Sequence, residues 1–169
     1  MKIMKIRNKI SIVGIVIVSI LLFSNCTTTQ QKTAGNYTYK TECLGVEGDG
    51  TQTLKAWGSG RNRFDAFAQA RKNAISDVIF KGILDGKSEC EMRALVPEVN
   101  AREKYEAYFN KFFEDGGEYR NYVSMRDEQW ENKLLRERKE GIGTVTHAAV
   151  VIVYRPKLKA KLIADGILK

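Results

Sequence analysis

The pattern of apolar and polar positions divides the chain into three parts. Residues 10–23 form an apolar run behind a basic start, and residues 27–40 are polar with almost no aliphatic side chains. From residue 43 onward, apolar residues recur with the periods of helices and strands. We therefore expect a leader over residues 1–25, a flexible tether over residues 26–42 and a single folded domain over residues 43–169.

The first half of this domain predicts a strand followed by two helices. Residues 51–58 alternate as a strand, Gly58-Ser59-Gly60 is expected to turn the chain, and Asn62 can cap a helix. Helical spacing runs over residues 64–79, ended by Gly82 and Gly86, and a second, aromatic helix is expected over residues 101–114. The apolar side chains of the first helix fall in one arc, namely Phe64, Phe67, Ala68, Ala74, Ile75, Val78 and Ile79.

The second half of the domain reads mainly as strands. Extended segments are expected over residues 119–126, 132–139 and 144–154, with residues 140–143 as a hairpin connection between the last two. Residues 148–153 are apolar on both faces, which predicts a central strand, and Pro156 can occupy the first turn of a short helix that runs to Ile163. This order predicts an α+β fold, a mostly antiparallel sheet with an alanine-rich helix and an aromatic-rich helix packed on it.

Part of this pattern resembles known families. A strand that ends in residues 57–60 precedes residues 65–74, in which Ala66, Ala70 and Ala74 recur at every fourth position. This arrangement resembles the LPP-twenty lipoprotein family and is similar to the N-terminal domain of flagellar assembly protein T. The resemblance covers about thirty of the 169 residues. It implies a small α+β envelope domain with an assembly or accessory role rather than a catalytic one.

The leader resembles a bacterial lipoprotein signal. A basic start and the apolar run lead into Leu22-Phe23-Ser24-Asn25-Cys26. In lipoproteins the cysteine thiol is diacylated, the leader is cut just before it, and the new amino group is acylated. The resemblance implies that Cys26 is the lipid-bearing first residue, although Asn25 stands where Gly, Ala or Ser is commoner. The alternatives are an ordinary signal peptide and an uncleaved anchor, but the apolar run is shorter than the roughly twenty residues of a spanning helix.

Lipidation at Cys26 predicts both a partner and a location. The membrane becomes a partner through the N-terminal lipid, and the domain belongs to the bacterial cell envelope. Asp directly behind the cysteine resembles an inner-membrane retention signal, and an acidic cluster resembles a surface-export signal. The residues that follow Cys26 contain neither. We therefore expect the periplasmic face of the outer membrane.

The charge of the chain argues against a nucleic-acid partner. The formal net charge is +8, but four cationic residues and no acidic ones lie in the leader, so the remaining chain carries +4. An exported protein also does not meet the nucleic acid of the cell. A mild positive charge favours anionic lipid head groups or acidic envelope polymers, or serves only ordinary solubility.

Two cysteines remain besides the lipidated one. Export to an oxidising compartment favours a disulfide between Cys43 and Cys90, with two buried free thiols as the alternative. Only His147 could join them around a metal ion, and the three residues lack the close spacing of metal ligands. We expect no metal and no cofactor.

The sequence contains no motif that predicts catalysis. Gly58 and Gly60 lack the third glycine of a dinucleotide site, and no serine stands in a nucleophile-elbow context to act with the single histidine, His147. Acidic residues are numerous enough to form a carboxylate pair by chance, so an envelope hydrolase stays as a third hypothesis. We expect no catalytic residue and no enzyme activity.

Two features are candidates for binding. Arg71 falls in the middle of the apolar arc of the first helix, where a guanidinium is costly unless it is paired or reaches water. We expect it to pair with a carboxylate or with backbone carbonyls, and a ligand-binding role is the alternative. The aromatic helix places Tyr105, Tyr108, Phe109 and Phe112 on one side, either as part of the core or as a groove for a peptide, a glycan or a partner helix.

The function that these features favour is a non-catalytic, lipid-anchored envelope protein with an assembly or accessory binding role. Its expected partner is another envelope protein or the cell-wall polymer. A carrier for a lipid or glycan ligand is the second hypothesis, and it requires an apolar cavity lined by the aromatic helix.

Overall fold

The computed structural model of the chain describes residues 39–126, 138–141 and 143–168. The chain divides into two units, residues 1–33 and 34–169, and all described residues belong to the second. The expected leader, Cys26 and most of the expected tether lie outside the described residues. No helix within the described part is long and apolar enough to cross a membrane.

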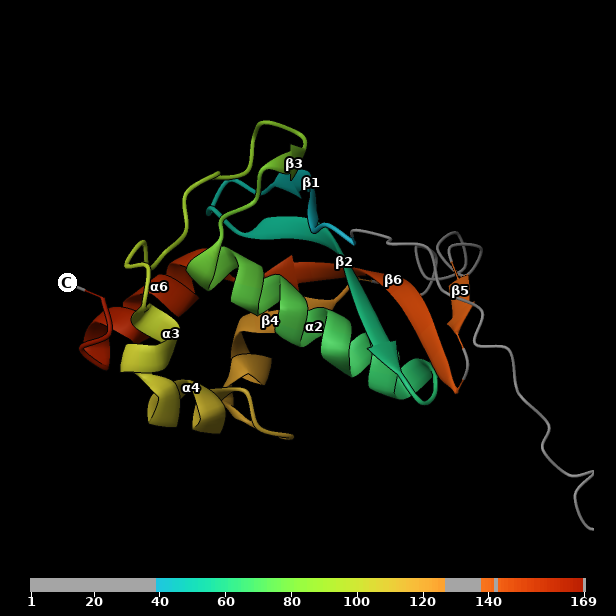
Figure 1. Cartoon of the computed structure of the whole chain (residues 1–169). Helices are drawn as coiled ribbons and strands as arrows, with labels where there is room; N and C mark the ends of the chain where they lie inside the picture. Colours follow the sequence, from blue (N-terminus) through green and yellow to red (C-terminus); the bar gives the residue numbers. More distant parts are fainter. Residues whose placement is uncertain (1–38, 127–137, 142, 169) are drawn as a thin grey trace, which may run out of the picture. The chain divides into compact units, whose positions relative to one another are not determined.

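The domain is built on a mostly antiparallel sheet around two long strands. β2 (Gln52–Gly60) pairs antiparallel with β6 (Thr144–Val153) along its whole length. The sheet order is β3-β1-β2-β6-β4, with β5 also on β6, and the only parallel pair within it joins β1 to β3 (Figure 1). The shorter strands are β1 (Glu42–Val46), β3 (Asp85–Gly86), β4 (Val123–Met125) and β5 (Arg138–Gly141). The predicted α+β class and the mostly antiparallel sheet are confirmed.

The alanine-rich helix forms where the sequence predicts it. α2 (Arg63–Phe80) packs across β2 and β6 on one face of the sheet (Figure 1). The Asn62 side chain accepts a hydrogen bond from the Asp65 N–H at 3.0 Å, as its position predicts. Gly82 ends the helix with a φ of 77°, and its N–H donates to the Asp77 carbonyl at 2.7 Å. Gly86 belongs to β3 instead.

The two glycines of β2 serve the contact with this helix and do not turn the chain. β2 continues through Gly60, so the expected turn at residues 58–60 is wrong, and the bend comes at residues 61–62. A Cβ on Gly58 would lie 2.1 Å from the Ala66 carbonyl oxygen, and one on Gly60 would lie 2.6 Å from the Ala66 nitrogen. The helix presents fully buried Ala66 and Ala70 at this contact. Glycine is therefore required because two backbones touch here.

The aromatic segment is more broken than its spacing predicts. In place of one helix over residues 101–114, the chain forms α3 (Ala101–Lys104) and α4 (Glu106–Phe112), separated at Tyr105. The expected strand over residues 119–126 begins as a 3-10 helix, η1 (Glu118–Tyr122), and only β4 is extended. Tyr119 and Tyr122 contact the rings of Phe113 and Phe112, and a 3-10 helix places residues three apart on one side.

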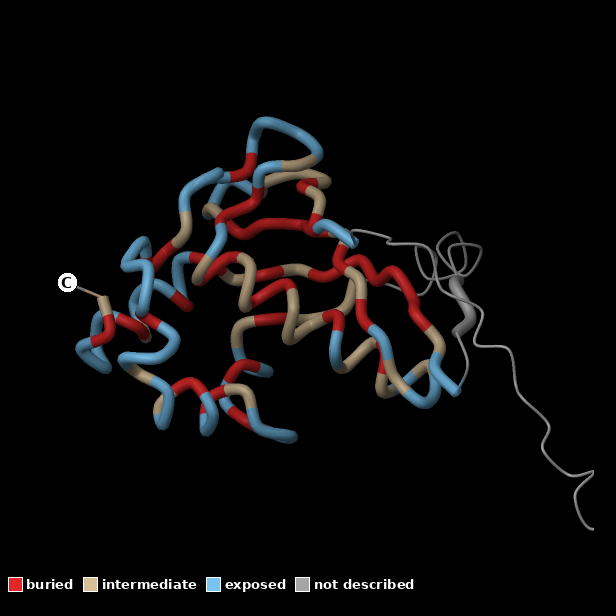
Figure 2. The backbone as a smooth tube through the Cα atoms, viewed as in Figure 1, coloured by how far each residue is buried: buried red, intermediate tan, exposed pale blue. Residues whose placement is uncertain are grey.

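The end of the chain follows the prediction closely. β6 spans residues 144–153, and the buried positions of the domain concentrate along β2, β6 and the side of α2 that faces them (Figure 2). α6 (Arg155–Ala164) starts with Pro156 in its first turn. Gly141 of β5 lies opposite Thr144 of β6, which confirms a hairpin, but β5 continues through Gly141, so the connection is shorter than the expected residues 140–143. Most of the expected strand over residues 132–139 lies outside the described residues.

Cys43 and Cys90 form the predicted disulfide, with an S–S distance of 2.01 Å and Cα atoms 5.9 Å apart. The bond ties the segment after β3 to β1. Closing a loop of 47 residues stabilises the fold by about 4 kcal/mol on the chain-entropy model. The same segment also satisfies the end of α2, because the N–H groups of Leu95 and Val96 donate to the Val78 and Ile79 carbonyls at 3.0 and 2.8 Å.

Gly58→Ala should lower the free energy of unfolding by at least about 2 kcal/mol, because its methyl group would overlap the α2 backbone and the helix would have to move. Gly48→Ala is the matched control, since a Cβ there meets nothing within 4 Å. It should change the free energy by less than about 0.5 kcal/mol. Urea unfolding followed by circular dichroism measures both. Equal effects of the two substitutions would contradict the close contact.

Candidate binding site beside Arg71

Helix α2 has two flanks, because β2 and β4 lie on opposite sides of β6 beneath it. On the β4 side, a cavity of about 350 Å³ opens at the surface. Its lining consists of four side chains from α2 and one from β4, namely Arg63, Phe64, Phe67, Arg71 and Met125. The cavity therefore combines two arginines with three large apolar side chains.

Arg71 has no counter-charge in the described structure. Its Nε atom is buried without a hydrogen-bond partner, and its guanidinium makes no hydrogen bond or ion pair with a described residue. The expected pairing with a carboxylate or with backbone carbonyls is therefore not what the structure has. A buried donor without a partner costs roughly 1–3 kcal/mol.

Arg155 shows what a partnered arginine looks like in the same domain. Its side chain is almost fully buried at the start of α6, and its Nε donates to the Glu91 carboxylate at 3.1 Å. Its Nη2 donates to the Arg93 carbonyl at 3.0 Å, so this arginine ties the segment after β3 to α6. Arg155 Nη1 is buried without a partner as well, so Arg71 differs in that none of its guanidinium nitrogens has a partner among the described residues.

The apolar wall of the cavity reaches from the core to the surface. Phe67 is half-buried, with the His147 ring 5.6 Å away on one side and the Arg63 guanidinium 4.9 Å from its centroid. Phe64 is 82% exposed, although its spacing places it in the apolar arc, because it lies at the first turn, on the rim of this cavity. Sequence periodicity alone cannot distinguish such a rim position from a core position.

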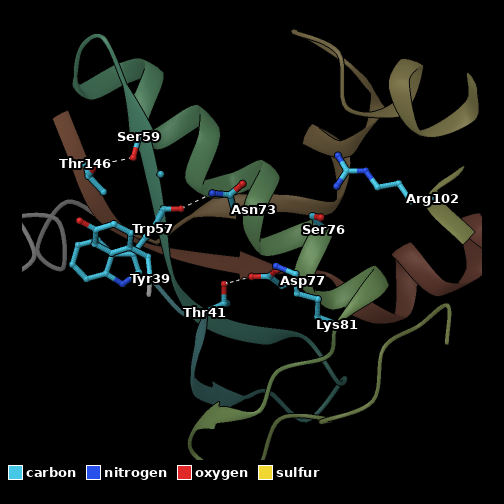
Figure 3. Close-up of a pocket in the computed structure, with 11 residues that line it drawn as sticks. Tyr39, Thr41, Trp57, Ser59, Asn73, Ser76, Asp77, Lys81, Arg102 and Thr146 are labelled. Carbon is cyan, nitrogen blue, oxygen red and sulfur yellow. Dashed lines mark hydrogen bonds and ion pairs between the residues drawn. The ribbon is translucent and has the colours of Figure 1, made fainter. Parts of the chain in front are cut away.

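The β2 flank of α2 carries a polar trough of about 290 Å³ (Figure 3). Its hydrogen-bonding groups largely satisfy one another. Asn73 Nδ2 donates to the Trp57 carbonyl at 2.7 Å, and Asp77 accepts from the Thr41 hydroxyl at 2.5 Å and pairs with Lys81 at 2.8 Å. Because these partners come from the chain itself, the trough has less need of a ligand than the Arg71 cavity.

The predicted aromatic stripe belongs mainly to the core. Phe109 and Phe112 are 3% exposed, while Tyr105 and Tyr108 are half-buried. The Phe109 ring packs edge-on against Phe80 of α2 at 4.7 Å. The residues that could have formed a groove are thus mostly used to attach α4 to the end of α2.

Tyr108 and Phe112 still line a surface cavity of about 310 Å³, together with the ion-paired side chains of Glu118, Lys161 and Asp165. The Tyr108 hydroxyl donates to Asp165 at 2.6 Å, and Lys161 pairs with both Asp165 and Glu118. Burial, followed by the hydrogen bond to Asp165, raises the pKa of Tyr108, and the same hydrogen bond lowers the pKa of Asp165. This network holds α4, η1 and α6 together and thus stabilises the fold.

No cluster of three or more His, Cys, Asp or Glu side chains occurs in the described ranges. His147 is buried on the α2 face of β6, where its ring packs against Phe67.

Comparison with protein-family models, with curated proteins and with solved structures found no match.

Arg71→Met should raise the free energy of unfolding by about 1 kcal/mol, because methionine keeps the length and helix propensity of arginine and removes the unpartnered donor. Arg155→Met should lower it by about 2 kcal/mol, because its bonds to Glu91 and to the Arg93 carbonyl are lost. Urea unfolding of both variants measures whether each substitution raises or lowers the free energy of unfolding. A clear loss of stability in Arg71→Met would mean that its guanidinium has a structural partner after all.

Proposed function

We propose that this protein is a lipid-anchored, non-catalytic accessory component of the bacterial cell envelope. In this proposal, Cys26 carries the lipid and the Arg71 cavity holds an anionic group of another envelope component. The single observation that carries the proposal is the Arg71 guanidinium, which lines an apolar cavity without a partner among the described residues.

A residue that lowers the free energy of unfolding and makes no polar contact within the protein is typical of a functional site. Replacing Arg71 with an apolar residue would complete the arc of the helix, and yet the cavity keeps a permanent positive charge there. An incoming carboxylate or phosphate can accept charge-assisted hydrogen bonds from this guanidinium, which are about twice as strong as neutral ones. The missing partner is therefore an anion from outside the domain.

The lining of the cavity favours binding over turnover. Arginine stays protonated at neutral pH, and phenylalanine and methionine have no ionisable group. The side chains of the cavity can thus bind and orient an anionic group, but they offer it neither a nucleophile nor a general base. This composition supports an accessory role and agrees with what the resemblance to envelope lipoproteins implies.

Photocrosslinking in bacterial cells tests the proposal with the full chain. Benzoylphenylalanine replaces Phe64, which is exposed at the cavity rim and can capture protein, glycan or lipid neighbours. We expect an adduct with an envelope component that Arg71→Met greatly reduces. Arg120→Met, which removes an exposed arginine outside the cavity, should leave it unchanged. Cys26→Ala should abolish labelling with palmitate and release the protein from the membrane fraction.

Two outcomes would contradict this function. One is an adduct at position 64 that does not depend on Arg71 or that forms equally from a crosslinker at exposed Val99. The other is turnover of a glycan or ester substrate by the purified chain that a carboxylate substitution abolishes, which would favour a hydrolase.

A further inference from the structure

The Arg71 cavity has two halves of different chemistry, and a ligand must match both. The charged half is the guanidinium of Arg71, with the Arg63 guanidinium over the nearby Phe67 ring. The apolar half is formed by Phe64, Phe67 and Met125. From this combination, and resting on the proposed binding function, we infer that the cavity binds a single-chain anionic amphiphile, a fatty-acid or monoalkyl-phosphate type of molecule.

The charged half defines the head of this ligand. A neutral head would leave the Arg71 guanidinium without a counter-charge, and a cationic head would repel it. A carboxylate or phosphate matches the planar fork of an arginine and can accept two parallel N–H bonds. Arg63, Phe67 and Arg71 follow one another at intervals of four residues, so they lie along one side of α2 with Phe67 between the two arginines. The head of the ligand and the nearest part of its tail would lie along this side of the helix.

The apolar half defines the tail. Phe67 is held against His147, while Phe64 is exposed and Met125 has a flexible, polarisable side chain that adapts to irregular shapes. A small inorganic anion would leave this wall in contact with water. A volume of about 350 Å³ lies at the lower end of small-molecule sites and suits one slender chain rather than the two chains of a membrane phospholipid.

Competition against a fluorescent fatty acid tests the inference. Dansylaminoundecanoate is added to the full chain carrying Cys26→Ser, so that no acyl group attached to the protein competes. Dodecanoate and dodecyl phosphate, kept below their micelle concentrations, should displace the probe. Dodecanol, dodecyltrimethylammonium, acetate and inorganic phosphate should displace it at least about tenfold less well, because each lacks the anionic head or the tail.

Variants separate the two halves of the cavity. Arg71→Met should weaken dodecanoate binding at least about tenfold and leave dodecanol unaffected, whereas the control Arg120→Met should leave both unchanged. Phe64→Ser removes an exposed apolar side chain at the rim without disturbing the core, so it should weaken dodecanoate binding while the melting temperature stays the same. These readings do not depend on whether Arg71→Met alters stability.

Three results would overturn the inference. Dodecanol that competes as well as dodecanoate would show a purely apolar site, and equal affinity in wild type and Arg71→Met would place the probe elsewhere. Tighter binding of N-acetyl-phenylalanyl-aspartate amide than of dodecanoate would assign the cavity to an acidic peptide. In that last case an Arg71-dependent adduct at position 64 would still support the proposed function, so the two proposals can fail separately.

Discussion

The rest of this domain depends on the direct backbone contact between α2 and β2. Gly58 and Gly60 have no side chains, and the helix meets them with Ala66 and Ala70, so the helix lies closer to the sheet than larger residues would permit. Around this contact the helix has room for only small side chains, whereas Ile75, Val78 and Ile79 are buried farther along it. Larger side chains of the first half of α2, such as Phe64 and Phe67, lie toward a flank and line the cavity there.

The polar side chains on the two flanks of α2 differ in whether they have partners within the chain. On the β2 side, Asn73 and Asp77 find partners in Trp57, Thr41 and Lys81, so the chain itself satisfies these polar groups of the trough. On the β4 side, Phe67 remains against the core while the guanidinium of Arg71 reaches a cavity without any partner from the described residues. The two flanks thus differ, because Asn73 and Asp77 are paired on one side and the Arg71 guanidinium is unpaired on the other.

Local signals predicted much of the fold. The alternation of β2, the cap at Asn62, the stop at Gly82 and the apolar run of β6 each act over a few residues and were read correctly. The disulfide between Cys43 and Cys90 agrees with the pairing that the number of cysteines and the expectation of export favoured. The function of Gly58 and Gly60 was missed because a glycine in a turn and a glycine under a helix look the same in sequence. The 3-10 turn before β4 was missed because ring contacts across the chain select it.

The candidate binding site was predictable only in its central residue. An arginine inside an apolar arc is visible in the sequence, and it identified Arg71. Whether such an arginine is paired depends on elements distant in sequence, as Arg155 shows through its contacts with the segment after β3. Met125 joins the cavity only because β4 pairs with the end of β6, and no local pattern encodes that neighbourhood. For the same reason the aromatic stripe could be read as a groove when it is mostly core.

The most direct test of this account is to observe the Nε–H groups of Arg71 and Arg155 by proton–nitrogen NMR during titration with dodecanoate. The Arg155 Nε–H already donates to Glu91 and serves as the internal control. We expect the Arg71 resonance to move progressively as the ligand is added and the Arg155 resonance to stay in place. An Arg71 resonance that does not respond, or that moves no more than that of Arg155, would contradict the claim that an anionic amphiphile binds at Arg71.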